Sequence, residues 1–108
     1  MTHEPGEQVF HALADSTRRT LIGYLSQHET ATATELAADL PVTRQAVAKH
    51  LHSLEEAGLV DRRRVGRETR YRLTPRPLTE AMVWMASVGG QWDERLERLR
   101  LVLEREGS

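Results

Sequence analysis

The stretch VTRQAVAKHLHSLEEAGLV, residues 42–60, predicts an amphipathic helix. Val47, Leu51 and Leu54 recur at intervals of four and three residues, which places their side chains on one face of a helix. The opposite side carries the residues that such a helix exposes: Arg44, Gln45, Ala48, Lys49 and His52. Many helices have a polar side that is only solvated, so the role of this side depends on the neighbouring segments.

The sequence also indicates where this helix begins and ends. Thr43 is suited to be the N-cap, because its hydroxyl can accept a hydrogen bond from the first turn. Gly58 stands where a left-handed C-cap residue belongs, and Leu59 is placed for the apolar contact that accompanies such a cap. We therefore expect a helix over about residues 43–57.

A shorter helix precedes the amphipathic one. Thr32 and Glu35, three residues apart, form a capping-box pattern, and Pro41 stops the helix that they begin. A turn of about three residues, 40–42, then leads into the longer helix. Two helices joined by so short a turn indicate a helix-turn-helix over about residues 32–57.

The segment that follows, about residues 60–73, predicts a β-hairpin. Its apolar residues alternate with polar ones, and Gly66 lies at a turn between two arms. The hairpin carries many cations: Arg62, Arg63, Arg64, Arg67, Arg70 and Arg72. These charges repel one another unless an anion screens them. Because a hairpin after a helix-turn-helix is a wing, we expect a mainly α fold with a small β-hairpin, a winged helix-turn-helix.

Composition narrows the class of protein. At 108 residues the chain is long enough for one modest core, so we expect a single domain over residues 1–108. It has no Cys, which excludes a disulfide framework and any thiolate metal or redox site. No apolar run approaches the ~20 residues that span a bilayer, and the N-terminus lacks the pattern of a signal peptide. We therefore expect a cytoplasmic protein without a membrane partner.

The net charge of −1 hides an asymmetry along the chain. Residues 43–76 hold nine of the 15 Lys and Arg residues but only four of the 16 acidic residues, so this segment carries +5. The rest of the chain carries −6. Positive charge concentrated in the amphipathic helix and the wing indicates a polyanion as partner.

Further helices are predicted on both sides of the winged unit. A short helix over about residues 5–14 carries Phe10, and Asp15 can cap the helix that follows it. A long helix over about residues 75–105 begins with Thr74 as N-cap.

The long C-terminal helix carries a heptad seam with alternating intervals of four and three residues: Leu78, Met82, Met85, Gly89, Trp92, Leu96, Leu99 and Leu103. Ala81, Trp84 and Val88 add a second stripe, so one helix has two surfaces to cover. A domain of this size is too small to cover both, which predicts a partner helix. The alternative is that the helix wraps its own domain.

With the tight turn and the wing in place, double-stranded DNA is the predicted partner. The N-terminal half of the amphipathic helix would enter the major groove, where Arg44 and Gln45 can each pair with base edges through two hydrogen bonds. Ala48 lets the helix approach closely, and the remaining cations would contact phosphates. The DNA-binding candidates are Thr43, Arg44, Gln45, Ala48, Lys49, His52, Arg62, Arg63, Arg64 and Arg67. For each of them the alternative is a solvated surface residue.

Three segments resemble the ArsR-type winged helix-turn-helix regulators of bacteria and archaea. They are HALADSTRRTLIGYL at 11–25, TATELAADLPVTRQAVAKHLHSLEEAGLVDRRRVGRETRYRLT at 32–74 and WDERLERLRLVL at 92–103. The resemblance implies a homodimer, paired largely through its first and last helices, that binds an inverted repeat in a promoter and represses transcription. The dimerisation candidates on these helices are Phe10, Met82, Met85, Trp92, Leu96, Leu99 and Leu103.

The sensor region departs from the metal-responsive members of this family. Those relatives carry a Cys-Val-Cys arrangement where this chain has Thr32, Ala33 and Thr34, none of them a soft ligand. A second family site uses Asp and His residues on the last helix, but this chain has no His after His52. The resemblance is therefore to a subgroup without metal sensing or a cofactor, whose members often regulate small operons including their own gene. Whether an inducer exists is open.

Two other classes of protein are alternatives to a DNA-binding regulator. An enzyme is not expected, because the chain has no Cys nucleophile, no glycine-rich phosphate loop, and no His and carboxylate at a spacing that would put a general base beside a nucleophile. A winged-helix module that pairs with another chain through the heptad seam is the stronger alternative. A protein-binding face more often exposes aromatic or apolar anchors than a row of arginines, so the charge favours DNA.

Overall fold

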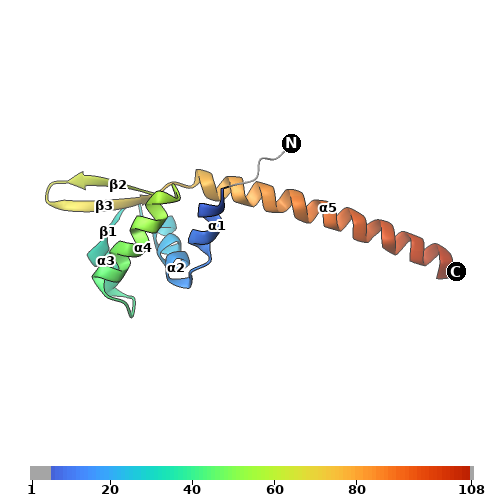
Figure 1. Ribbon diagram of the computed structural model, residues 1–108, viewed down its shortest axis with the longest axis horizontal. Helices are drawn as coiled ribbons and strands as arrows, with labels where there is room; N and C mark the ends of the chain where they lie inside the picture. The colour runs from blue at the N-terminus through green and yellow to red at the C-terminus, as the bar shows by residue number, and fades with distance from the viewer. Residues whose placement is uncertain (1–5, 108) are drawn as a thin grey trace.

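Five helices and three strands make up the part of the chain that the computed structural model describes, residues 6–107; at residues 92, 106 and 107 only the backbone is described. Their order is α1 (Glu7–Leu13), α2 (Ser16–Gln27), β1 (Ala31–Thr32), α3 (Ala33–Ala38), α4 (Arg44–Glu56), β2 (Val60–Val65), β3 (Glu68–Leu73) and α5 (Arg76–Gly107). Figure 1 shows α1 to α4 and the strands gathered at one end, with α5 running away from them. The molecule is 72 Å long and 30 by 22 Å across. None of the described helices is long and apolar enough to span a bilayer.

The core forms around the apolar face of α4. Val47, Leu51 and Leu54 are fully buried, as their spacing predicts. Apolar side chains from the other elements pack with them: Ala12, Leu21, Leu25, Ala31, Leu36, Leu59 and Val60. Full burial of one leucine side chain stabilises a fold by about 1.5–3 kcal/mol, so this cluster holds the short helices and the sheet together. Because the core takes one side of α4, the other side lies at the surface.

Both predicted ends of α4 are confirmed. The Thr43 hydroxyl accepts a hydrogen bond from the Ala46 amide at 3.1 Å. Gly58 has a φ of +76°, and the amide of Leu59 donates to the Leu54 carbonyl at 2.9 Å, which closes the C-terminal turn. The helix therefore presents a defined first turn to the surface.

The capping box that begins α3 is confirmed, and the helix ends one residue earlier than the predicted turn implies. Thr32 and Glu35 exchange side-chain to backbone hydrogen bonds, each of 3.1 Å. The helix ends at Ala38 with Asp39 as its C-cap, and the amide of Leu40 reaches back three residues, to the Ala37 carbonyl. Proline disfavours helical backbone in the residue before it, so Leu40 already leaves the helix and the turn is longer than predicted.

The predicted hairpin is part of a three-stranded antiparallel sheet in the order β1, β3, β2. β2 and β3 pair from Val60 opposite Leu73 to Val65 opposite Glu68, and Gly66 has a φ of +63° in the two-residue loop. The strand β1, which pairs with β3 at only two positions, was not predicted. Two residues are too few to show any periodicity, so only the pairing itself reveals this strand.

The first turns of α5 have one side covered by the domain and one side exposed. Ala81 is buried, and the Trp84 ring packs edge-on against Phe10 of α1 with ring centroids 5.7 Å apart. The described seam residues beyond Leu78 remain exposed, with exposed fractions of 66% at Met82, 47% at Met85, 57% at Leu96, 55% at Leu99 and 60% at Leu103. The second stripe is therefore covered at Ala81 and Trp84 but not at Val88, which is 37% exposed, and the alternative that α5 wraps its own domain is wrong for the seam. The Trp92 side chain, also predicted for the seam, lies outside the described residues.

Candidate nucleic-acid interface

The outer side of α4 holds the predicted base-reading residues at the surface. Arg44 and Gln45 lie in the first turn and are exposed, as are the other three residues of this side, Ala48, Lys49 and His52. The capped N-terminus directs this turn away from the core, because Val47 and Leu51 occupy the opposite side. The side chains that the sequence predicts for DNA therefore share one exposed face of one helix.

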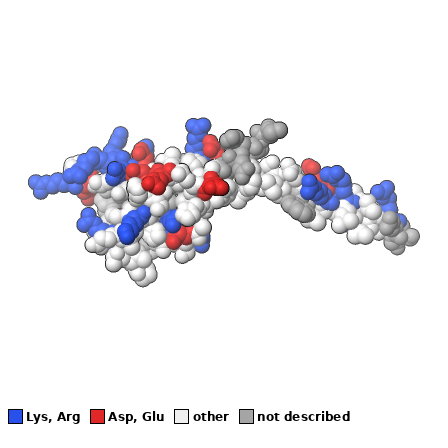
Figure 2. Space-filling model, in the orientation of Figure 1, with Lys and Arg blue, Asp and Glu red and all other residues white. Residues whose placement is uncertain are grey.

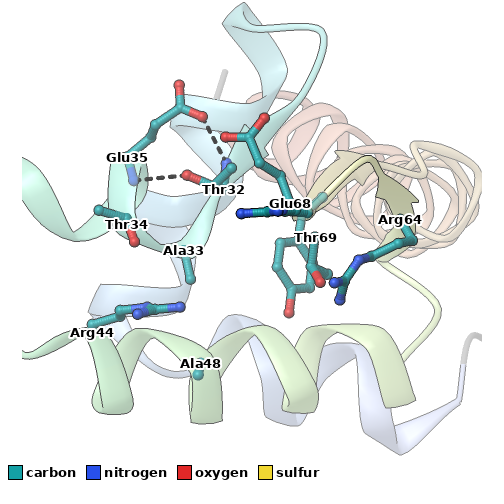
Figure 3. A pocket seen from close by; sticks show the side chains of 11 residues that line it. Thr32, Ala33, Thr34, Glu35, Arg44, Ala48, Arg64, Glu68 and Thr69 are labelled. Atoms are coloured by element: carbon teal, nitrogen blue, oxygen red, sulfur yellow. Dashed lines mark hydrogen bonds between the residues drawn. The ribbon is translucent and has the colours of Figure 1, made fainter.

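A hollow of about 600 Å³ lies between α4 and the wing. Figure 3 shows Arg44 and Ala48 on the α4 side of this hollow, with Arg64 and Thr69 of the wing across from them. Arg67 of the wing loop also lines it. Three arginine side chains, one from α4 and two from the wing, thus line one space.

The wing arginines do not act as one group, contrary to what their sequence position suggests. Neighbouring residues of a strand point to opposite faces, so Arg62 and Arg64 share a face and Arg63 lies on the other face, opposite Arg70. The Arg62 guanidinium lies 3.4 Å from the Glu55 carboxylate of α4, and the Arg64 side chain donates to the Gly66 carbonyl at 3.1 Å. Arg64 thus lines the hollow, whereas Arg62 ties the base of the wing to α4.

Several of the predicted cations have no acidic partner. Within residues 6–107, no ion pair involves Arg44, Lys49, Arg63 or Arg67. Figure 2 shows lysine and arginine side chains gathered at the end of the molecule that carries the wing. His52 differs from them, because its Nε2 lies 2.9 Å from a Glu56 carboxylate oxygen. Among the predicted cations, those without an acidic partner therefore lie in the first half of α4 and in the wing.

Some residues of this surface were not predicted from the sequence. Thr34 and Tyr71 line the hollow, although neither belongs to α4 or to the charged set. No local pattern marks them, because the pairing of β1 with β3 brings them to this place. Arg70, predicted to be an exposed cation of the wing, has only 23% of its side chain exposed.

A hydrogen-bonded link joins α4 to α2 behind the surface. The side chain of Arg18 donates to Nδ1 of His50 at 3.3 Å and to the His11 carbonyl at 3.1 Å. Asp15 caps α2. The hydrogen bond that its carboxylate accepts from the Arg18 amide is the main cause of its lowered pKa. His50 therefore accepts a hydrogen bond that joins α2 to α4.

The positions that correspond to the metal-sensing motif contain no metal ligand. Thr32 caps α3, Ala33 begins it and Thr34 lines the hollow. Across the described part of the chain, no three His, Cys, Asp or Glu residues are grouped so that they could hold a metal ion.

A tight turn, an exposed polar helix face and a basic wing around one hollow define a DNA-binding winged helix-turn-helix transcriptional regulator. Residues 13–63 match the family described as helix-turn-helix domain. The chain is 46% identical over 67 residues to the HTH-type transcriptional regulator YuzN of Bacillus subtilis, covering 56% of this chain and 73% of YuzN. It is 27% identical over 88 residues to the transcriptional repressor SdpR of the same species, covering 82% of this chain and 97% of SdpR.

The fold agrees with these relatives. An ArsR-like transcriptional regulator from Rhodococcus sp. RHA1 superposes with a TM-score of 0.76 at 40% identity, over 88% of this chain and 89% of that one. The chain belongs to the ArsR family of winged helix-turn-helix regulators. This result favours DNA binding over the alternative of a protein-interaction module.

Proposed function

We propose that this regulator is a homodimeric repressor that binds an inverted repeat in a promoter and does not respond to metal. One observation carries the proposal: the uncompensated basic surface lies at one end of the molecule, and an exposed apolar seam runs along the helix that leaves that end. A charged end suits the phosphates of DNA, whereas an apolar helix face needs another apolar face to cover it.

In the DNA complex, the first half of α4 lies in the major groove. Arg44 and Gln45 contact base edges, and Ala48, which has no bulky side chain, allows the helix to approach. Phosphates are contacted by Lys49 and by Arg64 and Arg67 around the hollow. The remaining candidates, Thr43, His52, Arg62 and Arg63, lie at the margin of this contact, with Arg62 and His52 partly engaged by glutamates.

In the dimer, the seam of α5 pairs with the same seam of a second copy. Such an isologous contact covers the five exposed seam residues of both chains at once and relates the two α4 helices by a twofold axis. The two helices then read half-sites about one turn of DNA apart, which requires an inverted repeat. Phe10 supports this arrangement by packing on Trp84 and holding α5 against its own domain.

The repressor role is supported by the similarity to SdpR, itself a repressor. The protein would act in the cytoplasm, on the promoter of a small operon that includes its own gene. The lack of a soft ligand at Thr32, Ala33 and Thr34 supports regulation without metal.

The test is selection of bound fragments from sheared genomic DNA of the source organism at near-physiological salt, with the mass of the protein in solution measured alongside. Enrichment of one inverted repeat by a dimer supports the proposal and identifies the promoter. The logarithm of the binding constant should fall linearly with the logarithm of salt concentration. Folded protein that enriches no sequence, or whose binding does not respond to salt, contradicts the proposal. Zinc or cadmium ions should leave the affinity unchanged.

A further inference from the structure

Arg70 lies at the point from which the wing projects. β3 pairs with β1 only at Tyr71 and Arg70, so Arg70 is the last residue before the tip that has a third strand beside it. Beyond it, residues 65–69 have only the hairpin's own pairing. The contacts of Arg70 are therefore placed where they can affect the direction of the wing tip.

Three groups hold the Arg70 side chain. Its Nε donates to the Thr30 hydroxyl at 2.8 Å, Nη2 lies 3.1 Å from Oε1 of Glu35, and Nη1 donates to Glu68 at 3.2 Å. Only 23% of the side chain is exposed, compared with 64% for Arg72 on the same strand. This arginine is occupied inside the protein and is not presented to DNA.

Glu35 connects this arginine to the helix-turn-helix. The carboxylate oxygen that forms the ion pair with Arg70 also accepts a hydrogen bond from the Thr32 amide, in the capping box of α3. Figure 3 shows this capping box at the rim of the hollow. Hydrogen bonding from that amide is the main cause of the lowered pKa of Glu35, with Arg70 adding to it. One carboxylate thus joins the start of α3 to the root of the wing.

We propose that Glu35 and Arg70 are positioning residues for DNA binding, which hold the wing at the angle that places Arg64 and Arg67 across from Arg44. This inference rests on the proposed DNA-binding function. Three residues of strand between Arg70 and the tip span about 10 Å, so a tilt of about 10° at Arg70 moves the tip by about 2 Å. A hydrogen bond to a phosphate does not survive such a displacement.

The test is the variant Glu35→Gln, because glutamine can keep the capping box while removing the charge that holds Arg70. Loss of a negative charge near DNA should by itself strengthen binding, whereas loss of positioning weakens it, so the two explanations predict opposite signs. We expect the affinity to fall about fivefold at 0.15 M salt and the salt slope to fall by about 0.9, the contribution of one phosphate contact.

Glu68→Gln is the matched control. It removes another carboxylate that contacts Arg70, but Glu68 belongs to the same hairpin and does not connect it to α3. We expect this variant to bind DNA at least as tightly as the wild type. Wild-type or tighter binding by Glu35→Gln, or an equal loss in both variants, would overturn the proposal.

Hydrogen exchange without DNA separates this proposal from the proposed function. Glu35→Gln should speed exchange of the amides that pair β1 with β3, and Glu68→Gln should not. Unchanged protection in Glu35→Gln overturns the positioning role even if its DNA affinity falls. A wild-type protein that binds no DNA would contradict the proposed function, while the exchange rates would still decide whether Glu35 holds the wing.

Discussion

Replacing Leu96 and Leu99 together by alanine should weaken the dimer without unfolding the winged domain. Both side chains belong to the α5 seam and are exposed in the single chain, at 57% and 55%. Neither belongs to the core around α4. The last residue along the chain that packs on this core is Leu78. Their loss should therefore appear in association alone.

The size of the effect follows from the exposed area. Full burial of a leucine side chain is worth about 1.5–3 kcal/mol, and about half of it is still available here, so each truncation costs about 1 kcal/mol. A twofold dimer contains four altered side chains, which together cost about 4 kcal/mol and raise the Kd of dimerisation about 1,000-fold. The stronger change to glutamate at both positions should leave a monomer, because it places charges on the seam.

Sedimentation across a range of protein concentrations measures this shift, and circular dichroism checks that the fold is retained. Leu101→Ala is the matched control, since Leu101 is 46% exposed on the same helix but lies about 140° around it from Leu96. An alanine double variant that dimerises as tightly as the wild type refutes the seam. Equal weakening by Leu101→Ala would show that apolar loss anywhere on α5 has the same effect.

Three further predictions concern DNA reading and stability. Arg44→Ala should reduce discrimination between operator and random DNA by about 1–3 kcal/mol in competition binding, and equal loss on both sequences would contradict a base contact. Gly58→Ala should lower the free energy of unfolding in urea by about 1–2 kcal/mol, because the φ of +76° is left-handed. Gly23→Ala, in open space on α2, should instead be neutral or stabilising, and a similar loss there would contradict this reasoning. The Asp15 carboxylate has its pKa lowered below 3.8 in the folded state by the Arg18 amide, so it stabilises the fold above that pH and less as the pH falls through the folded value. Asp15→Asn keeps the cap without the charge, so its stability in urea should fall less between pH 6 and 3 than that of the wild type.

Local patterns predicted α4 and its surroundings well. Each of these features depends on residues only a few positions apart: the start of α4 at Thr43, its end at Gly58 and the loop at Gly66. The α5 seam was also predicted, because a repeat of four and three residues needs no knowledge of the rest of the fold. The end of α3 was misplaced by one residue, and the two-residue strand β1 was not predicted.

The different contacts of the individual wing arginines were not predicted. In the sequence, Arg62, Arg64 and Arg70 look equivalent, yet the first is tied to Glu55, the second lines the hollow and the third is held by Glu35. These partners are 7 and 35 residues away from Arg62 and Arg70. Charge counts therefore indicated a polyanion partner without showing which cations are available to it.

The sequence by itself determined the class of fold, the face that α4 exposes and the side of α5 that needs a partner, because helix periodicity and capping act over one or two turns. The tertiary structure decided how the wing is attached. β1 has only two residues, and its pairing with β3, the hollow beside α4 and the contact of Glu35 with Arg70 all join segments that are far apart in the chain. Such contacts depend on how the elements pack, and no local pattern of residues records them.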